Sequence, residues 1–178
     1  MLELGQKAPA FDLPSTSGAN VSLAALAGRK VVLYFYPRDS TPGCTREACE
    51  FRDLHAEMLA AGAVVLGVSA DSLKAHDKFR AAQRLPFDLL SDAGNRIASA
   101  YGAFGEKVMY GKRVIGVIRS TFVIDERGKL AALWSPVKVD GHARAVLDAL
   151  TGVRAPAPET KRTARAMPTK RGKPRGSR

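Results

Sequence analysis

The chain has 178 residues, a formal net charge of +11 and a hydrophobic fraction of 46%. This length fits one domain with a short appendage, and it is sufficient to bury a full core. No apolar run approaches the roughly 20 residues that a membrane span needs. Residues 1–6 also lack the charged and apolar regions of a signal peptide. We therefore expect a cytoplasmic protein that does not enter the membrane.

The positive charge is concentrated at the end of the sequence. Residues 151–178 contain nine Lys or Arg and one acid, a net charge of +8, which leaves +3 for residues 1–150. Few large apolar side chains occur there, so we predict a folded domain over 1–152 and a basic, disordered tail over 153–178. The tail is either an arm that touches nucleic acid or a solubilising segment. The second is favoured, because the tail has no aromatic residue to stack on bases.

The first predicted elements are short until an apolar strand appears. Prolines limit residues 2–13 to a short edge strand. Ser22 is placed to cap a helical turn that ends at Gly28. Residues 31–36 consist of Val, Leu, Tyr and Phe only, which predicts a buried strand in a sheet that is covered on both faces.

Helices and strands then alternate. Apolar residues at helical spacing predict a helix over 45–61, and an apolar run predicts a second buried strand over 63–70. The remaining predicted elements are a helix over 73–84 capped by Asp71 and Ser72, a strand over 86–90, a helix over 93–101, strands over 120–125 and 130–134 joined by a hairpin turn, and a helix over 140–151. Residues 102–117 show no clear pattern. This order predicts an α/β protein with a thioredoxin-like fold, a mixed β-sheet flanked by helices.

Both cysteines of the chain follow the strand at 31–36. Loop residues lead from that strand to Cys44, where the helical pattern begins. At such a junction, free backbone N–H groups and the helix dipole favour an anion, and a thiolate is one. Cys44 is therefore a candidate reactive cysteine. The alternative is that Cys44 and Cys49 are ordinary buried apolar side chains.

Three residues of the same loop suit the chemistry of a thiolate. The hydroxyl of Thr41 can donate a hydrogen bond to the thiolate or accept one from a substrate. Pro37 stiffens the loop, and Gly43 lets the backbone approach another group closely.

One residue of the sequence is a candidate for the cation that would stabilise the thiolate. Arg119 precedes the strand at 120–125, and it could reach Cys44 if that strand neighbours the strand at 31–36. Its alternative is a solvated arginine at the end of a strand, which the sequence alone favours.

The spacing of the two cysteines separates their side chains. In a continuous α-helix, five residues correspond to about 7.5 Å of rise, about 140° of rotation and about 8.7 Å between Cα atoms. That distance exceeds the limit of about 7 Å for a disulfide. Cys44 and Cys49 therefore suit sequential roles, and any bond between them requires the first turn of the helix to unwind.

We expect neither a metal site nor a cofactor site. The cysteine spacing is longer than in zinc sites and no second pair follows. Residues 102–105 do not form a dinucleotide fingerprint. His55, His76 and His142 fall on predicted helices away from Cys44, and we expect them to be exposed or half-buried.

The cysteine loop resembles that of the peroxiredoxins. Pro37, Thr41 and Cys44 match the signature P-x-x-x-T/S-x-x-C, and residues 35–49 (FYPRDSTPGCTREAC) are similar to the peroxiredoxin Q/bacterioferritin comigratory protein branch. Four further segments are similar at corresponding places: GVSADS at 67–72, PFDLLSD at 86–92, RSTFVID at 119–125 and VDGH at 139–142. The resemblance covers about residues 1–150. Phe104 departs from it, because this branch is expected to have Trp there.

The resemblance implies an antioxidant, thioredoxin-dependent peroxidase of the atypical two-cysteine type. Cys44 would be the peroxidatic cysteine that attacks hydrogen peroxide or an organic hydroperoxide and becomes a sulfenic acid. Cys49 would resolve it as an intramolecular disulfide, which thioredoxin or a similar dithiol protein would reduce. Pro37 would shield the site from water, and three residues would bind the peroxide: Thr41, Gly43 and Arg119. An intramolecular disulfide needs no partner subunit, so we expect a monomer.

Two other functions compete with this interpretation. A protein disulfide oxidoreductase on the same fold would be expected to carry C-x-x-C near the first helix, and that motif is absent. A redox sensor without catalytic activity, or a nucleic-acid-binding protein, would use the basic tail.

Overall fold

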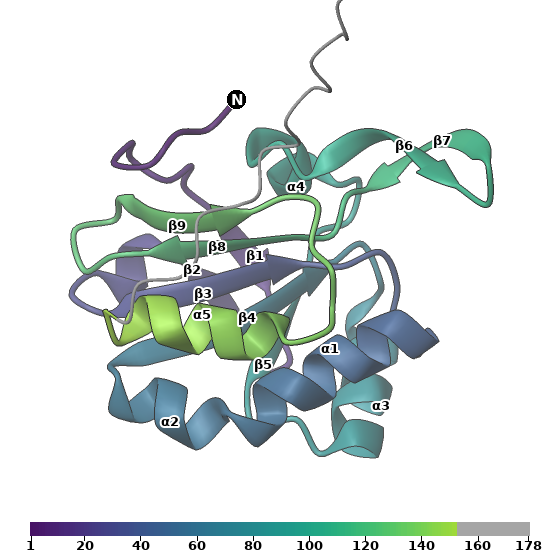
Figure 1. Cartoon of the computed structure of the whole chain (residues 1–178). Helices are drawn as coiled ribbons and strands as arrows, with labels where there is room; N and C mark the ends of the chain where they lie inside the picture. Colours follow the sequence, from purple (N-terminus) through teal and green to yellow (C-terminus); the bar gives the residue numbers. More distant parts are fainter. Residues whose placement is uncertain (153–178) are drawn as a thin grey trace, which may run out of the picture.

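The computed structural model describes residues 1–152, so the predicted tail lies outside the described residues. Its centre is a five-stranded sheet in the order β5-β4-β3-β8-β9 (Figure 1). These strands are β3 (Lys30–Phe35), β4 (Ala63–Ser69), β5 (Asp88–Ser91), β8 (Ser120–Ile124) and β9 (Leu130–Trp134). The first three run parallel, whereas β8 pairs antiparallel with β3 and β9 pairs antiparallel with β8. The predicted mixed sheet is confirmed.

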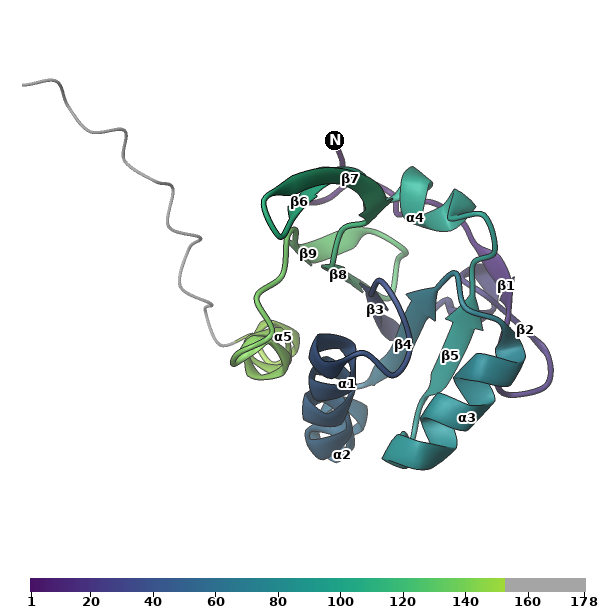
Figure 2. The same cartoon turned by 90° about the vertical axis from the view of Figure 1, so that its right-hand side faces the viewer.

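The sheet separates two apolar cores. Alternate side chains of β3 point to opposite faces, so Tyr34 packs in one core and Phe35 in the other. Four helices cover the face of Tyr34: α1 (Pro42–Asp53), α2 (His55–Ala60), α3 (Leu73–Gln83) and α5 (His142–Leu150). The other face is covered by the N-terminal segment with its small sheet of β1 (Asp12–Pro14) and β2 (Asn20–Ser22), and by α4 (Arg96–Ala100) (Figure 2). Burial on both faces explains why β3 is apolar from Val31 onward.

The predicted helix over 45–61 is two helices. The break falls at Leu54, whose backbone leaves the helical region at φ −101° and ψ 4°. The first helix, α1, also begins earlier than predicted, because Pro42 occupies its first position, where a missing N–H costs nothing. Cys44 therefore lies inside the first turn of α1.

The unassigned stretch at 102–117 is a β-hairpin. It consists of β6 (Phe104–Met109) and β7 (Lys112–Val117), joined by Tyr110 and Gly111, which both have positive φ as a two-residue hairpin turn requires. The hairpin stands out from the domain (Figure 1). Its strands are exposed or half-buried except at Val117, so no hydrophobic alternation marks them in the sequence.

The expectation for the histidines is wrong for two of the three. His76 and His142 are buried, with 0% and 5% of their surface exposed, and only His55 is half-buried. Each buried ring has hydrogen-bond partners that the sequence pattern does not reveal. The Nε2 atom of His142 lies 2.7 Å from the hydroxyl of Thr121, and burial lowers the pKa of His142 to about 4.

The predicted cap of α3 is present, because the hydroxyl of Ser72 accepts a hydrogen bond from the backbone N–H of Ala75. The hydroxyl of Ser22 accepts a hydrogen bond from the backbone N–H of Ala25, but the N-cap position of the 3₁₀ turn, η1 (Ala24–Leu26), is Leu23 and not Ser22 as predicted.

Candidate active site

Cys44 lies where β3 passes through a loop into α1, and its side chain is 1% exposed. Because β8 pairs with β3, with Ser120 opposite Phe35, Arg119 stands beside the end of β3. The Nη2 atom of Arg119 donates a hydrogen bond to the Sγ atom of Cys44 over 3.3 Å. The predicted approach of Arg119 to Cys44 is therefore present, and the alternative of a solvated arginine is wrong.

The sequence reasoning missed a third member of this site, Glu47. It follows Cys44 by three residues on α1, so both side chains share one face of the helix. Glu47 is 1% exposed, and its Oε2 atom accepts a hydrogen bond from the Nη1 atom of Arg119. Arg119 thus joins the thiol and the carboxylate through two arms of one guanidinium group. The three-residue spacing from Cys44 is the signal that could have identified Glu47.

Burial and pairing oppose each other in this cluster. Burial raises the pKa of Glu47 to about 7, although Arg119 lowers it. Burial also works against the charge of Arg119, but Glu47 and Cys44 outweigh it and raise the pKa of that guanidinium. Arg119 is therefore a permanent cation, and together with the N-terminal end of α1 it supplies positive potential at the sulfur.

The structure shows how Thr41 and Gly43 relate to this cluster. Thr41 precedes α1, and its hydroxyl donates to the backbone carbonyl of Arg38 over 2.9 Å, so it stabilises the loop. At Gly43, an added Cβ atom would lie 3.3 Å from the Nη2 atom of Arg119. Glycine at this position leaves room for the guanidinium beside Cys44.

A hollow of about 560 Å³ opens beside Arg119. Its walls come from the loop before α1, the β6–β7 hairpin, the segment before β8 and the segment after β9. The apolar lining residues are Pro37, Val108, Met109, Ile118 and Pro136, and Glu106 and Lys107 add two charged side chains from the hairpin. The approach to the guanidinium that contacts the thiol is therefore mostly, but not entirely, apolar.

Cys49 lies on the same uninterrupted helix as Cys44, and both thiols are free. Cys49 is half-buried, and its thiol donates to the Oε1 atom of Gln83, the last residue of α3, over 3.5 Å. The two cysteines thus contact different partners on different sides of α1. This agrees with the helical geometry that forbids a disulfide while α1 is folded.

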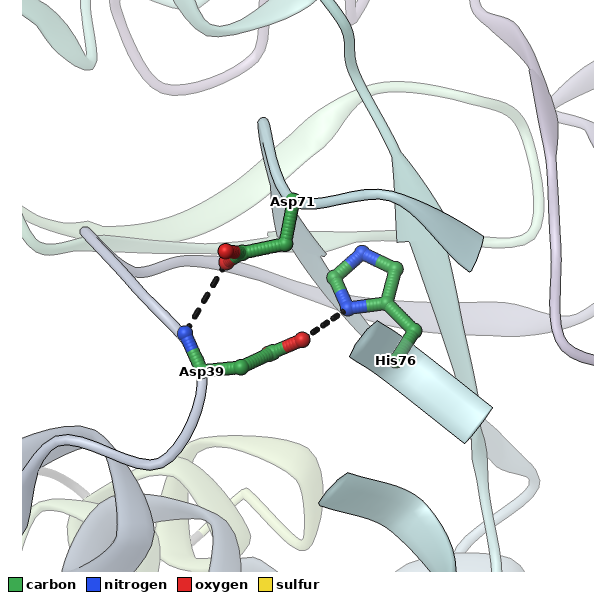
Figure 3. Close-up of side chains that lie close together, drawn as sticks. All are labelled: Asp39, Asp71 and His76. Carbon is green, nitrogen blue, oxygen red and sulfur yellow. Dashed lines mark hydrogen bonds and ion pairs between the residues drawn. The ribbon is translucent and has the colours of Figure 1, made fainter. Parts of the chain in front are cut away.

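Three side chains beside the cysteine loop have metal-ligand atoms close together. Atoms of Asp39, Asp71 and His76 lie within 4.8 Å of one another (Figure 3). Each of these side chains already has a protein partner. Asp39 bonds to His76 over 2.7 Å, and Asp71 accepts from the backbone N–H of Asp39 over 2.9 Å and from the hydroxyl of Ser69 over 2.6 Å. These contacts indicate a hydrogen-bonded network that tethers the loop.

The fold and the site together define a class of protein. A buried thiol at the start of the helix that follows a central strand, with an arginine donating to its sulfur, is equipped for cysteine redox chemistry. This geometry defines a thiol-based oxidoreductase on a thioredoxin-like fold.

Comparison with known proteins identifies the family. The model of the AhpC/TSA family matches residues 4–133. A putative peroxiredoxin bcp of Coxiella burnetii is 52% identical over 149 residues, which are 84% of this chain and 99% of that protein. The chain belongs to the AhpC/TSA family, as a peroxiredoxin.

Solved structures agree with this assignment. Xanthomonas campestris peroxiredoxin Q is 47% identical with a TM-score of 0.76, over 80% of this chain and 90% of that chain. A structure of the bacterioferritin comigratory protein of the same organism, solved to study its alkyl peroxide reduction activity, is 46% identical with a TM-score of 0.75 and the same coverage.

The relatives decide between the two enzymatic functions. The chain is a thiol-dependent peroxidase that consumes a peroxide and a thiol reductant, so the interpretation as a protein disulfide oxidoreductase is set aside. Within residues 1–152, no helix is long and apolar enough to cross a membrane.

Proposed function

We propose that Cys44 is the peroxidatic cysteine and Cys49 the resolving cysteine of this peroxidase. The observation that carries the proposal is the 3.3 Å hydrogen bond from Arg119 to the sulfur of Cys44. A cation at this distance stabilises the thiolate, which is the nucleophile in thiol redox chemistry. In the proposed cycle, the same guanidinium also binds the peroxide oxygens.

The first step is the oxidation of Cys44. The thiolate attacks one oxygen of the hydroperoxide, an S–O bond forms and the O–O bond breaks. The other oxygen leaves with the electron pair of that bond and takes up a proton, as water or an alcohol. The sulfur becomes a sulfenic acid. Arg119 stabilises the negative charge on the leaving oxygen, and Thr41 and Gly43 complete the binding site for the peroxide.

The second step requires α1 to open. The thiol of Cys49 attacks the sulfenic sulfur of Cys44, a disulfide forms and water leaves. Because the two residues share one helix, the first turns of α1 must unwind before the sulfurs meet. A dithiol protein such as thioredoxin then reduces the disulfide and returns both thiols.

The hollow beside Arg119 favours peroxides that carry an organic group. Its apolar walls, including Pro37, Val108 and Met109, can receive an alkyl or aryl substituent while the peroxide oxygens face Arg119. Pro37 also shields the site from water. We therefore propose that organic hydroperoxides are substrates beside hydrogen peroxide.

Stopped-flow assays with peroxide, thioredoxin and thioredoxin reductase test this cycle. Cys44→Ser should abolish turnover. Cys49→Ser should undergo one rapid oxidation and then fail to recycle with thioredoxin. Normal recycling of Cys49→Ser would refute the resolving role. Comparing hydrogen peroxide with cumene hydroperoxide tests the substrate class, since Met109→Glu should raise KM for the aromatic substrate only.

We also propose that the peroxidase acts as a cytoplasmic monomer with a catalytic domain over residues 1–152 and a solubilising tail over 153–178. An intramolecular disulfide requires no second subunit, and the nine basic residues after residue 150 come without an aromatic side chain. Sedimentation at micromolar concentration tests the monomer. A salt-dependent DNA shift that is lost on truncation after residue 152 would overturn the solubilising role of the tail.

A further inference from the structure

A buried, hydrogen-bonded pair of side chains, Asp39 and His76, holds the loop that precedes Cys44. Asp39 and His76 are 8% and 0% exposed, and the Oδ2 atom of Asp39 lies 2.7 Å from the Nδ1 atom of His76 (Figure 3). The other oxygen of Asp39 accepts from the hydroxyl of Tyr36 over 2.6 Å. His76 belongs to α3, so this contact ties the cysteine loop to an element that is distant in the sequence.

The partners of His76 determine where its protons lie. The Nε2 atom faces the backbone carbonyl of Leu90 over 3.0 Å, and a carbonyl can only accept. The Nδ1 atom faces the carboxylate of Asp39, which is also an acceptor. With Asp39 ionised, both ring nitrogens carry hydrogen and the two side chains form an ion pair.

The loop needs this attachment because its own structure is weak. Ser40 adopts a left-handed conformation with φ 60°, which costs free energy for a residue with a side chain. Thr41, at the N-terminal cap position of α1, offers no side-chain hydrogen bond to the helix. The first turn of α1, which contains Cys44, therefore depends on contacts from outside the helix.

We propose that His76 is a positioning residue of the peroxidase, which acts through Asp39 to hold residues 37–41 and so keeps the first turn of α1 folded. The strength of this pair sets how often Cys44 leaves Arg119 to meet Cys49. This inference rests on the proposed roles of the two cysteines.

The pair then decides between two fates of the sulfenic acid. When the loop is released, Cys49 reaches Cys44, a disulfide forms and water leaves. While the loop is held, a second hydroperoxide can transfer an oxygen atom to the sulfenic sulfur, which is oxidised to a sulfinic acid while the peroxide is reduced to water or an alcohol. A weaker pair favours the disulfide and protects Cys44 from irreversible oxidation.

Amide hydrogen exchange of the reduced protein is the first test, with variants His76→Leu and Asp39→Asn. Protection over residues 38–46 should fall about tenfold or more, while β3 and β4 keep theirs. His76→Gln keeps one amide donor, so its protection over residues 38–46 should be intermediate between that of these two variants and that of the wild type. His55→Gln is the matched control on α2 and should change nothing. The double variant should open no further than His76→Leu, because each change removes the same pair.

Mass spectrometry after graded peroxide treatment is the second test. The His76 and Asp39 variants should show several-fold less sulfinic acid at Cys44 than the wild type. Nitrogen-15 NMR of the imidazole rings is the third, and His76 should be protonated at both ring nitrogens.

Three results would overturn the proposal: unchanged protection over residues 38–46, a uniform loss of protection across the domain, or a neutral ring at His76. The exchange and NMR measurements need no peroxide. They therefore decide the role of His76 even if Cys44 proves unreactive and the proposed function fails.

Discussion

Two helices of this domain follow neighbouring parallel strands, yet they begin differently. α3 follows β4 and is capped by the adjacent residue, Ser72, whose hydroxyl accepts a hydrogen bond from the backbone N–H of Ala75. α1 follows β3, and Thr41 at the equivalent position gives it no such bond. Its first turn is held instead by partners from other elements: Arg119 on the sulfur of Cys44, and the tether between Asp39 and His76.

The difference matches what each helix must do. α3 covers the sheet and carries His76, and a local cap makes its start independent of its surroundings. α1 carries two thiols that cannot meet while it is folded. A start that depends on a few external contacts can open when those contacts are lost, without unfolding the remainder of the domain.

The largest expected effect is the loss of the cation at the start of α1. Arg119→Met keeps most of the side-chain volume but removes the charge beside the sulfur. We expect the second-order rate of Cys44 oxidation to fall about 100-fold or more, as when a preorganised donor is removed from a transition state. Competition against a reference peroxidase measures this rate. Arg113→Met, on the exposed hairpin, is the control, and a fall of less than about threefold for Arg119→Met would contradict the account.

Glu47 should impose a pH dependence on stability. Burial raises its pKa from 4.5 to about 7, so between these pH values the folded protein keeps a proton that the unfolded chain has released. Stability therefore falls as the pH rises through this window, by up to about 3 kcal/mol. Urea unfolding at pH 5 and pH 7.5 measures the change. Glu47→Gln should flatten this slope, and Glu126→Gln, in an exposed turn, should keep it. A wild-type slope of the opposite sign would show that pairing with Arg119 outweighs burial.

The two helix starts can be separated by paired substitutions. Ser72→Ala should cost about 1 kcal/mol of stability and leave the oxidation of Cys44 unchanged. Thr41→Val should cost less stability, since its hydroxyl bonds only within the loop, and should slow the oxidation about tenfold. Denaturant titration and stopped-flow fluorescence give the two quantities. If the two substitutions changed the stability and the oxidation rate equally, the two helix starts would not differ in this way.

Gly43 should give the smallest effect. The Cβ atom of alanine would stand 3.3 Å from the Nη2 atom of Arg119, which can move away by a few tenths of an ångström. We expect Gly43→Ala to slow Cys44 oxidation about threefold, because small misplacements of a catalytic group reduce rates. Competition against a reference peroxidase again measures the rate. A rate equal to that of the wild type would mean that glycine is not needed for Arg119 to approach Cys44.

The sequence predicted the elements whose patterns are local. The apolar run at 31–36, the cap at Ser72 and the junction at Cys44 each follow from neighbouring residues, and the structure has them. The contact of Arg119 with Cys44 depends on the pairing of β8 with β3. The sequence alone could not show that these two strands are neighbours.

What the sequence could not predict depends on contacts between distant elements. The burial of His76 follows from Asp39 and the carbonyl of Leu90, which come from other elements. The β6–β7 hairpin escaped prediction because exposed strands have no hydrophobic alternation. Glu47 was overlooked since a glutamate on a helix is usually solvated, and only Arg119 explains its burial.

In the proposed cycle the site opens once per turnover, at the start of α1. The most direct measurement is amide exchange of the wild-type protein before and after one equivalent of peroxide, with the disulfide mapped on the same sample. We expect a bond between Cys44 and Cys49, with protection lost over residues 42–49 and retained in α3. A bond between these cysteines with protection over 42–49 unchanged, or oxidation of Cys44 without any such bond, would contradict the account.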